Sequence, residues 1–184
     1  MPTTTLIHTR LQIPEPHPEV TAVSQLELAR GVAFVAAAQL GGRRIGTFEN
    51  DGQGGPTEFL AADPDTFGPE HLAALAAQCL HDGEPVTADE LMDLLIEEHD
   101  SIQAVTGFPA HESTVARLLS HGYTAAYDFI PIPATAQHSA RTAEALAQAH
   151  PGATGTWQRW TGQNWEPLTA PENPDPAAHP APRP

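Results

Sequence analysis

One segment of the chain, Val32–Ala61, constrains the fold most, because two glycine-rich turns divide it into three strand-like stretches. The first turn is Gly41-Gly42, a pair in which both residues can adopt the positive φ angles of a tight hairpin turn. The second turn is the longer glycine-rich stretch 50–56. Consecutive strands joined in this way predict an antiparallel meander. The predicted strands are residues 32–40, 43–49 and 57–61.

Apolar periodicity predicts the remaining elements. Alternation indicates strands, and a capping box at Thr87 together with apolar residues three or four apart indicates helices. The further predicted strands are residues 5–13 and 123–132, with a hairpin over 157–168. The predicted helices are residues 69–82, 87–100, 109–121 and 139–150.

The order of these elements predicts the fold class. Strands come first as a group and helices follow as a group, a pattern typical of an α+β fold. We therefore expect one antiparallel sheet, built from the N-terminal meander and the C-terminal hairpin, with three to four helices packed on one face. Residues 1–168 are expected to form a single domain. Residues 169–184 are rich in proline and are expected to form a disordered tail.

Composition indicates the cellular compartment and the type of organism to expect. The N-terminal residues carry no secretory signal, and the longest apolar run, Val32–Ala38, is too short to span a membrane. The single cysteine, Cys79, excludes an internal disulfide framework. We expect a cytoplasmic protein. The abundance of alanine, proline and arginine is typical of a high-GC bacterium such as an actinobacterium.

Charge is the most informative part of the composition. The chain carries 8 basic and 23 acidic residues, for a net charge of −15, and every basic residue is arginine. No basic residue lies between Arg44 and Arg117, a stretch with 15 carboxylates. Nucleic acids and anionic membranes bind through cations, so we expect neither to be a direct partner. A basic or neutral protein partner, or a metal cation, is compatible with this surface.

The predicted helix 87–100 concentrates this charge. Asp89, Asp93 and Glu97 are four residues apart and share one face, although like charges at this spacing destabilise a helix. Three further carboxylates widen the face: Glu90, Glu98 and Asp100. One interpretation is the solvated face of an acidic protein. The other, which we adopt as the functional hypothesis, is a non-enzymatic interaction protein that binds a basic protein partner through this face.

An alternative hypothesis is a metal-dependent hydrolase that uses histidine, aspartate and glutamate side chains from residues 81–121. The ten histidines are scattered and show no close metal-binding pair, so this hypothesis depends on how the chain folds. The candidate ligands are His81, Asp82, His99, Asp100 and His111. Beyond a divalent metal, no cofactor is expected.

The turn at residues 50–56 allows one further interpretation. Counted from Thr47, three carboxylates fall at the ligand positions of a calcium-binding EF-hand loop: Glu49, Asp51 and Glu58. The first position is a threonine and the flanking segments are strands, so coincidence in an acidic turn is the preferred explanation.

Two stretches carry a resemblance to known proteins. These are Gly31-Val32-Ala33-Phe34 and the run from Leu40 to Gly55, which contains Ile45-Gly46 and Asn50-Asp51-Gly52-Gln53-Gly54-Gly55. Over about residues 31–60 the chain resembles small uncharacterised proteins of bacteriophages and mobile elements, which share an Ile-Gly return strand and an Asn-Asp-Gly-x-Gly-Gly turn. The resemblance implies a phage-like or prophage-like setting and assigns no role to any residue.

Overall fold

The computed structural model describes residues 2–29, 31–107, 113–119, 126–133, 139–152 and 154–168. The tail predicted for residues 169–184 lies outside them. The strands are β1 (Thr3–Thr5), β2 (Gln12–Pro14), β3 (Pro18–Leu28), β4 (Gly31–Leu40), β5 (Arg43–Asn50), β6 (Glu58–Ala61), β7 (Leu80–His81), β8 (Glu84–Pro85), β9 (Ser113–Leu119), β10 (Ala126–Pro133), β11 (Thr156–Trp160) and β12 (Trp165–Pro167). The helices are α1 (Pro69–Ala76), α2 (Ala88–Thr106) and α3 (Ser139–Ala149).

The described strands form three antiparallel four-stranded sheets. The N-terminal sheet has the order β1-β2-β7-β8, the meander sheet β3-β4-β5-β6, and the C-terminal sheet β10-β9-β11-β12. The expected single sheet with three to four helices on one face is therefore wrong. The C-terminal hairpin does not join the meander, because it pairs with β9 and completes a sheet of its own.

The meander follows the sequence prediction at three of its strands. β4, β5 and β6 reproduce the predicted stretches to within one residue at each end. The sheet also contains β3, an edge strand that the sequence did not predict, which pairs along its length with β4. Ala36 and Phe48 lie opposite each other in the centre and are fully buried. This inner face contributes to the larger of two hydrophobic clusters.

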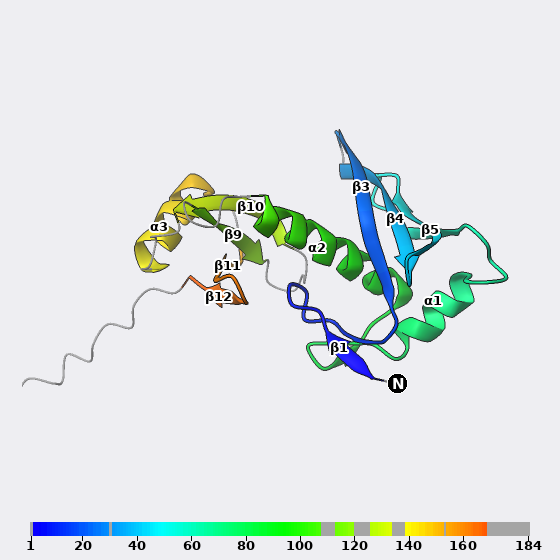
Figure 1. The fold of residues 1–184 in the computed structure, drawn as a ribbon. Coiled ribbons are helices and arrows are strands. Elements are labelled where there is room, and N and C mark those ends of the chain that lie inside the picture. The colour runs from blue at the N-terminus through cyan, green and yellow to red at the C-terminus, as the bar shows by residue number, and fades with distance from the viewer. Residues whose placement is uncertain are drawn as a thin grey trace, which may run out of the picture.

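Helix α2 connects the two halves of the molecule (Figure 1). Its N-terminus is fixed by the predicted capping box, in which Thr87 and Glu90 exchange hydrogen bonds. Its apolar stripe, which includes the buried Leu91 and Leu95, packs into the larger cluster with α1 and the meander sheet. Further along, α2 contacts β9 and β10. The second cluster lies in the C-terminal sheet and includes Leu146 of α3 and Trp157 of β11.

Two predicted elements are wrong. Residues 5–13 do not form one strand, because the chain turns back between Leu6 and Leu11, with Arg10 at a φ of 64°. The helix predicted over 109–121 is contradicted by strand β9, in which Val115–Leu118 are all buried. A strand that is buried on both faces does not alternate between apolar and polar residues. The apolar residues Val115, Leu118 and Leu119 therefore showed the three- and four-residue spacing that is typical of a helix.

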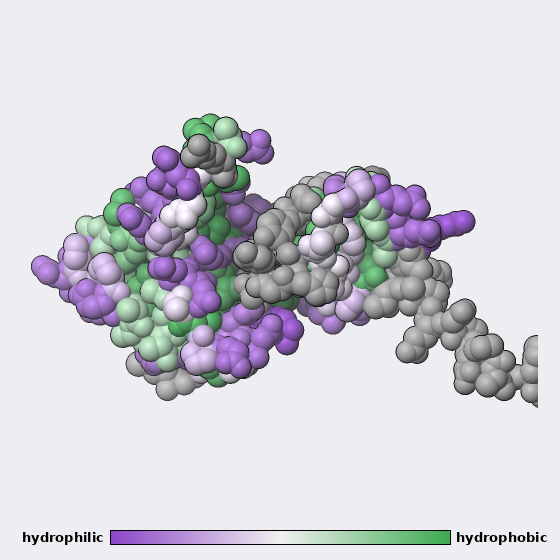
Figure 2. Space-filling model, turned by 180° about the vertical axis from the view of Figure 1, so that it is seen from behind, coloured by the Kyte–Doolittle hydropathy of each residue, from purple (hydrophilic) through white to green (hydrophobic). Residues whose placement is uncertain are grey.

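The exposed tip of one hairpin and the character of the helices complete the description. Seen from behind, hydrophobic side chains gather at the projecting end of the β3–β4 hairpin (Figure 2), where Leu26, Leu28 and Val32 are 64%, 42% and 43% exposed. Among the described helices, none combines the length and the apolar character needed to cross a membrane.

Candidate functional site

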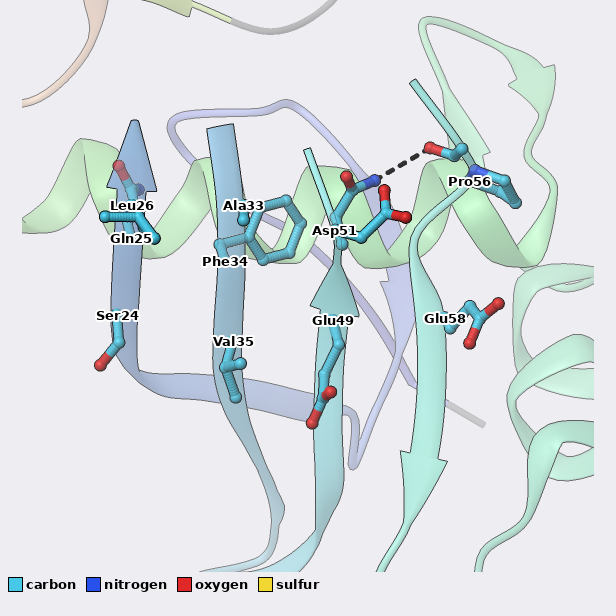
Figure 3. A pocket seen from close by; sticks show the side chains of 12 residues that line it. Ser24, Gln25, Leu26, Ala33, Phe34, Val35, Glu49, Asp51, Pro56 and Glu58 are labelled. Carbon is cyan, nitrogen blue, oxygen red and sulfur yellow. Dashed lines mark hydrogen bonds between the residues drawn. The ribbon is translucent and has the colours of Figure 1, made fainter. Parts of the chain in front are cut away.

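A row of directly opposed residues crosses the outer face of the meander sheet. The inner face is identified by Gln25, whose side chain donates a hydrogen bond to Asp100 of α2 at 3.4 Å. Neighbouring residues of a strand point to opposite faces, so Ser24 marks the outer face. The register places in one row, from β3 to β6, Ser24, Val35, Glu49 and Glu58. Figure 3 shows these four side chains in the pocket that they line.

The pocket is an open groove of about 440 Å³. Its carboxylates are Glu49, Asp51 and Glu58, and its apolar wall includes Leu26 and Val35. Both of these apolar residues are large and substantially exposed, Leu26 at 64% and Val35 at 43%. Among the described residues that line the groove there is no arginine or histidine. It therefore combines negative charge with apolar surface.

Glu49 and Glu58 are opposed like charges. Two like charges directly across an antiparallel pair destabilise a sheet, by roughly 0.2–1 kcal/mol on the scale of cross-strand pairs. Glu49 accepts one hydrogen bond, from the Thr47 hydroxyl at 2.8 Å. In the part of the chain that the structure describes, neither carboxylate forms an ion pair. Their charge is thus available to a binding partner.

The loop between β5 and β6 is held by its own side chains. The Asn50 side chain accepts from the Gly52 N–H at 2.8 Å and donates to the Gly55 carbonyl at 3.0 Å (dashed in Figure 3). Gly52 has a φ of 71°, and a Cβ atom there would lie 2.6 Å from the Ala33 nitrogen. Only glycine allows the loop to lie this close to β4, so the loop forms a fixed end of the groove.

The first three carboxylates predicted on α2 lie in different surroundings. Asp89 is exposed. Glu90 belongs to the capping box, and hydrogen bonds from the backbone and hydroxyl of Thr87 lower the pKa of its carboxyl. Asp93 accepts a hydrogen bond from the Thr57 hydroxyl at 2.7 Å. Burial raises the pKa of Asp93, with Asp89 and Glu90 adding to the rise.

The other three carboxylates of the helix each contact a different part of the fold. Glu97 is 8% exposed, and its Oε1 lies 3.9 Å from Nη1 of Arg117. Glu98 accepts hydrogen bonds from the backbone N–H groups of His8 and Thr9, at 3.0 and 2.8 Å, and from the Thr9 hydroxyl. Asp100 accepts from Gln25, and burial raises its pKa. Among the six, Asp89 alone has no hydrogen bond or ion pair to another described residue.

The candidate metal ligands are engaged in other contacts. Nε2 of His81 lies 2.9 Å from the Thr9 carbonyl oxygen, and Nδ1 of His99 lies 2.9 Å from the Val20 carbonyl oxygen. Asp82 pairs with an arginine, at 3.0 Å. His111 lies outside the described residues. Within the described ranges, no group of three or more histidine, cysteine, aspartate or glutamate side chains could hold a metal ion.

The sequence analysis considered Glu49 and Glu58 only as ligand positions of a calcium-binding loop and did not identify them as an opposed pair that could bind a partner, although the signal for that pair was present. The turn predicted at residues 50–56 joins the two predicted strands that carry these residues. A hairpin closed there brings the flanking residues opposite each other, as the observed register does.

Comparisons with known proteins give no relative. No family model, no curated protein and no solved structure matches the chain.

Proposed function

We propose that this chain is a non-enzymatic acidic interaction protein that binds a basic protein partner through the outer face of the meander sheet. One observation carries the proposal. Glu49 and Glu58 oppose each other beside the exposed side chain of Val35, in a groove whose described lining residues include no cation.

The chemistry of the groove matches lysine and arginine. Both side chains have an apolar stem and a charged end, so the stem can pack on Val35 or Leu26 while the cation lies between the carboxylates. A bound cation also relieves the repulsion between Glu49 and Glu58. The net charge of −15 would speed the approach of a basic partner and disfavour acidic ones.

The proposal also covers the kind of partner, the compartment and the biological context. The acidic surface argues against direct binding of nucleic acid, so the partner is a basic protein, such as one that itself holds nucleic acid. We place the protein in the cytoplasm, in a phage-like or prophage-like context. The α2 carboxylates contribute less to this proposal than the groove does, because five of the six make contacts within the chain.

The experiment is calorimetric titration of the full chain with a short peptide of alternating lysine and valine. We expect binding that weakens steeply as the salt concentration rises from about 0.01 M to about 1 M, because the Debye length falls from about 30 Å to about 3 Å. A peptide with glutamate in place of lysine, and a DNA duplex, should not bind. Absence of lysine-peptide binding at low salt, or tighter binding of DNA, would overturn the proposal.

A further inference from the structure

A second cavity, of about 550 Å³, lies between the turn after β1 and the C-terminal sheet. Its volume falls within the range of roughly 300–1,000 Å³ that is typical of small-molecule sites. The turn contributes Ile7–Arg10, and β7 contributes His81. The C-terminal sheet contributes Gln158 and Trp165. Such sites often lie where separate parts of a fold meet.

The cavity is rich in hydrogen-bond donors. The indole Nε1–H of Trp165 donates to Nδ1 of His8 at 2.9 Å, so in the neutral imidazole the hydrogen is on Nε2. Oε1 of Gln158 accepts from Nε of Arg117 at 3.1 Å, which leaves the amide N–H₂ of Gln158 as a donor. Oδ1 of Asn164 likewise accepts from the Thr161 hydroxyl, and its N–H₂ remains.

An ion pair between Arg10 and Asp82 lies at the edge of this cavity. Nη2 of Arg10 lies 3.0 Å from Oδ1 of Asp82, and both side chains are largely exposed, at 72% and 51%. In the described ranges these two are the non-glycine residues with positive φ, 64° for Arg10 and 50° for Asp82. Two strained residues thus hold a guanidinium against a carboxylate, and strain of this kind is concentrated at functional sites.

The acidic helix behind the cavity does not compete for these donors. Glu98 already accepts three hydrogen bonds from His8 and Thr9. Arg117, 4.2 Å above the Trp165 ring, lies beside Glu97 and donates to the His8 carbonyl at 2.9 Å. The wall that faces a ligand therefore offers N–H groups, with Asp82 as the carboxylate among the lining residues.

We propose that this cavity binds a small molecule through an oxyanion group, either a carboxylate or a phosphate, that takes the place of Asp82 on Arg10. The amides of Gln158 and Asn164 donate further hydrogen bonds to the same ligand. A guanidinium binds both kinds of oxyanion in the same forked geometry. Binding of this ligand is separate from the binding of a basic partner in the groove and uses different residues.

The test is calorimetric titration of the full chain with succinate and with inorganic phosphate. We expect dissociation constants of about 1 mM for ligands of this size. Binding of either probe supports the site, and the probe that binds more tightly names the source of the oxyanion. Binding of neither probe would overturn it.

Three variants make the test specific. Asp82→Asn removes the competing carboxylate and suits the positive φ, so it should tighten binding by about threefold to tenfold. Arg10→Gln should weaken binding by about tenfold or more. Arg43→Gln makes the same charge change at an arginine of similar exposure, 70%, outside the cavity, and should leave affinity unchanged. No effect of Asp82→Asn, or equal losses in the two arginine variants, would overturn the proposal even where a probe binds.

Discussion

Trp165 donates its indole N–H to Nδ1 of His8 across 2.9 Å, which ties the turn after β1 to the last described strand. The rings of His8 and Trp160 also lie 4.8 Å apart. Arg117 and Glu98 contact the backbone of His8 as well. One residue near the start of the chain thus receives contacts from α2, β9, β11 and β12.

Replacing Trp165 with phenylalanine should show the contribution of this hydrogen bond. The ring under Arg117 is retained, while Nδ1 of His8 loses its donor, so the free energy of unfolding should fall by about 1 kcal/mol. Urea denaturation measures the change. Trp160→Phe is the matched control, because the Trp160 indole N–H has no hydrogen-bond partner among the described residues. Equal losses in the two variants would contradict the assignment.

The same junction should respond to acid. Burial lowers the pKa of His8 below its ordinary value of 6.5, and Arg117 lowers it further, although Glu98 opposes the shift. Below pH 6.5 the unfolded chain binds the proton more readily than the folded chain, so His8 makes the protein less stable as pH falls from 6.5 through the lowered pKa.

Comparison with His8→Gln isolates this effect, because glutamine does not titrate. The unfolding free energy of the original chain should fall relative to the variant between pH 7 and pH 5. Asp93 and Asp100, whose raised pKa values act in the opposite direction, are common to both proteins. A difference between the two proteins that does not change with pH would contradict the prediction.

Arg117 is a buried cation whose loss should be costly. Burial lowers its pKa to about 10, while Glu97 and Glu98 oppose the shift. Arg117→Met leaves the His8 carbonyl and Gln158 without their donor and removes the cation beside Glu97, so unfolding should become easier by about 3–5 kcal/mol. Adding Glu97→Gln should recover part of the loss. Denaturant titration of both variants checks this, and a double variant less stable than the single one would contradict it.

Cys79 should behave as a buried apolar side chain. It is fully buried, and burial raises the pKa of its thiol to about 11. At pH 8 the thiol is protonated and covered, so a thiol reagent should modify it only in denaturant. Rapid modification of the native protein would show that the packing around α1 is wrong.

Local signals in the sequence predicted a good part of this fold. Gly41-Gly42 and the turn at 50–56 predicted the meander because hairpin turns need residues that tolerate positive φ. Thr87 predicted the start of α2 because a cap is a local device. The apolar face of the helix predicted over 69–82 also predicted the burial of Cys79, which the structure confirms, although α1 ends at Ala76 and Cys79 lies beyond it.

The failures arise from tertiary contacts. Residues 115–118 are buried on both faces of β9, and β3 is exposed on both faces over most of its length, so neither shows the alternation of a half-buried strand. Glu97 and Glu98 appeared as surface charge because nothing in the helix sequence shows that Arg117 and the turn at His8 will meet them. The candidate site depends on the register between β5 and β6, which places Glu49 opposite Glu58. In the sequence, only the turn at residues 50–56 indicated that register.

The central claim is that Glu49 and Glu58 bind the cations of a partner. Its most direct test compares Glu49→Lys/Glu58→Lys with Asp65→Lys/Glu84→Lys, which changes net charge equally at exposed positions outside the groove. In titrations with the lysine–valine peptide, we expect the groove variant to lose about tenfold or more in affinity. The control variant should lose no more than about twofold. Equal losses in both variants, or an unchanged affinity in the groove variant, would contradict the account.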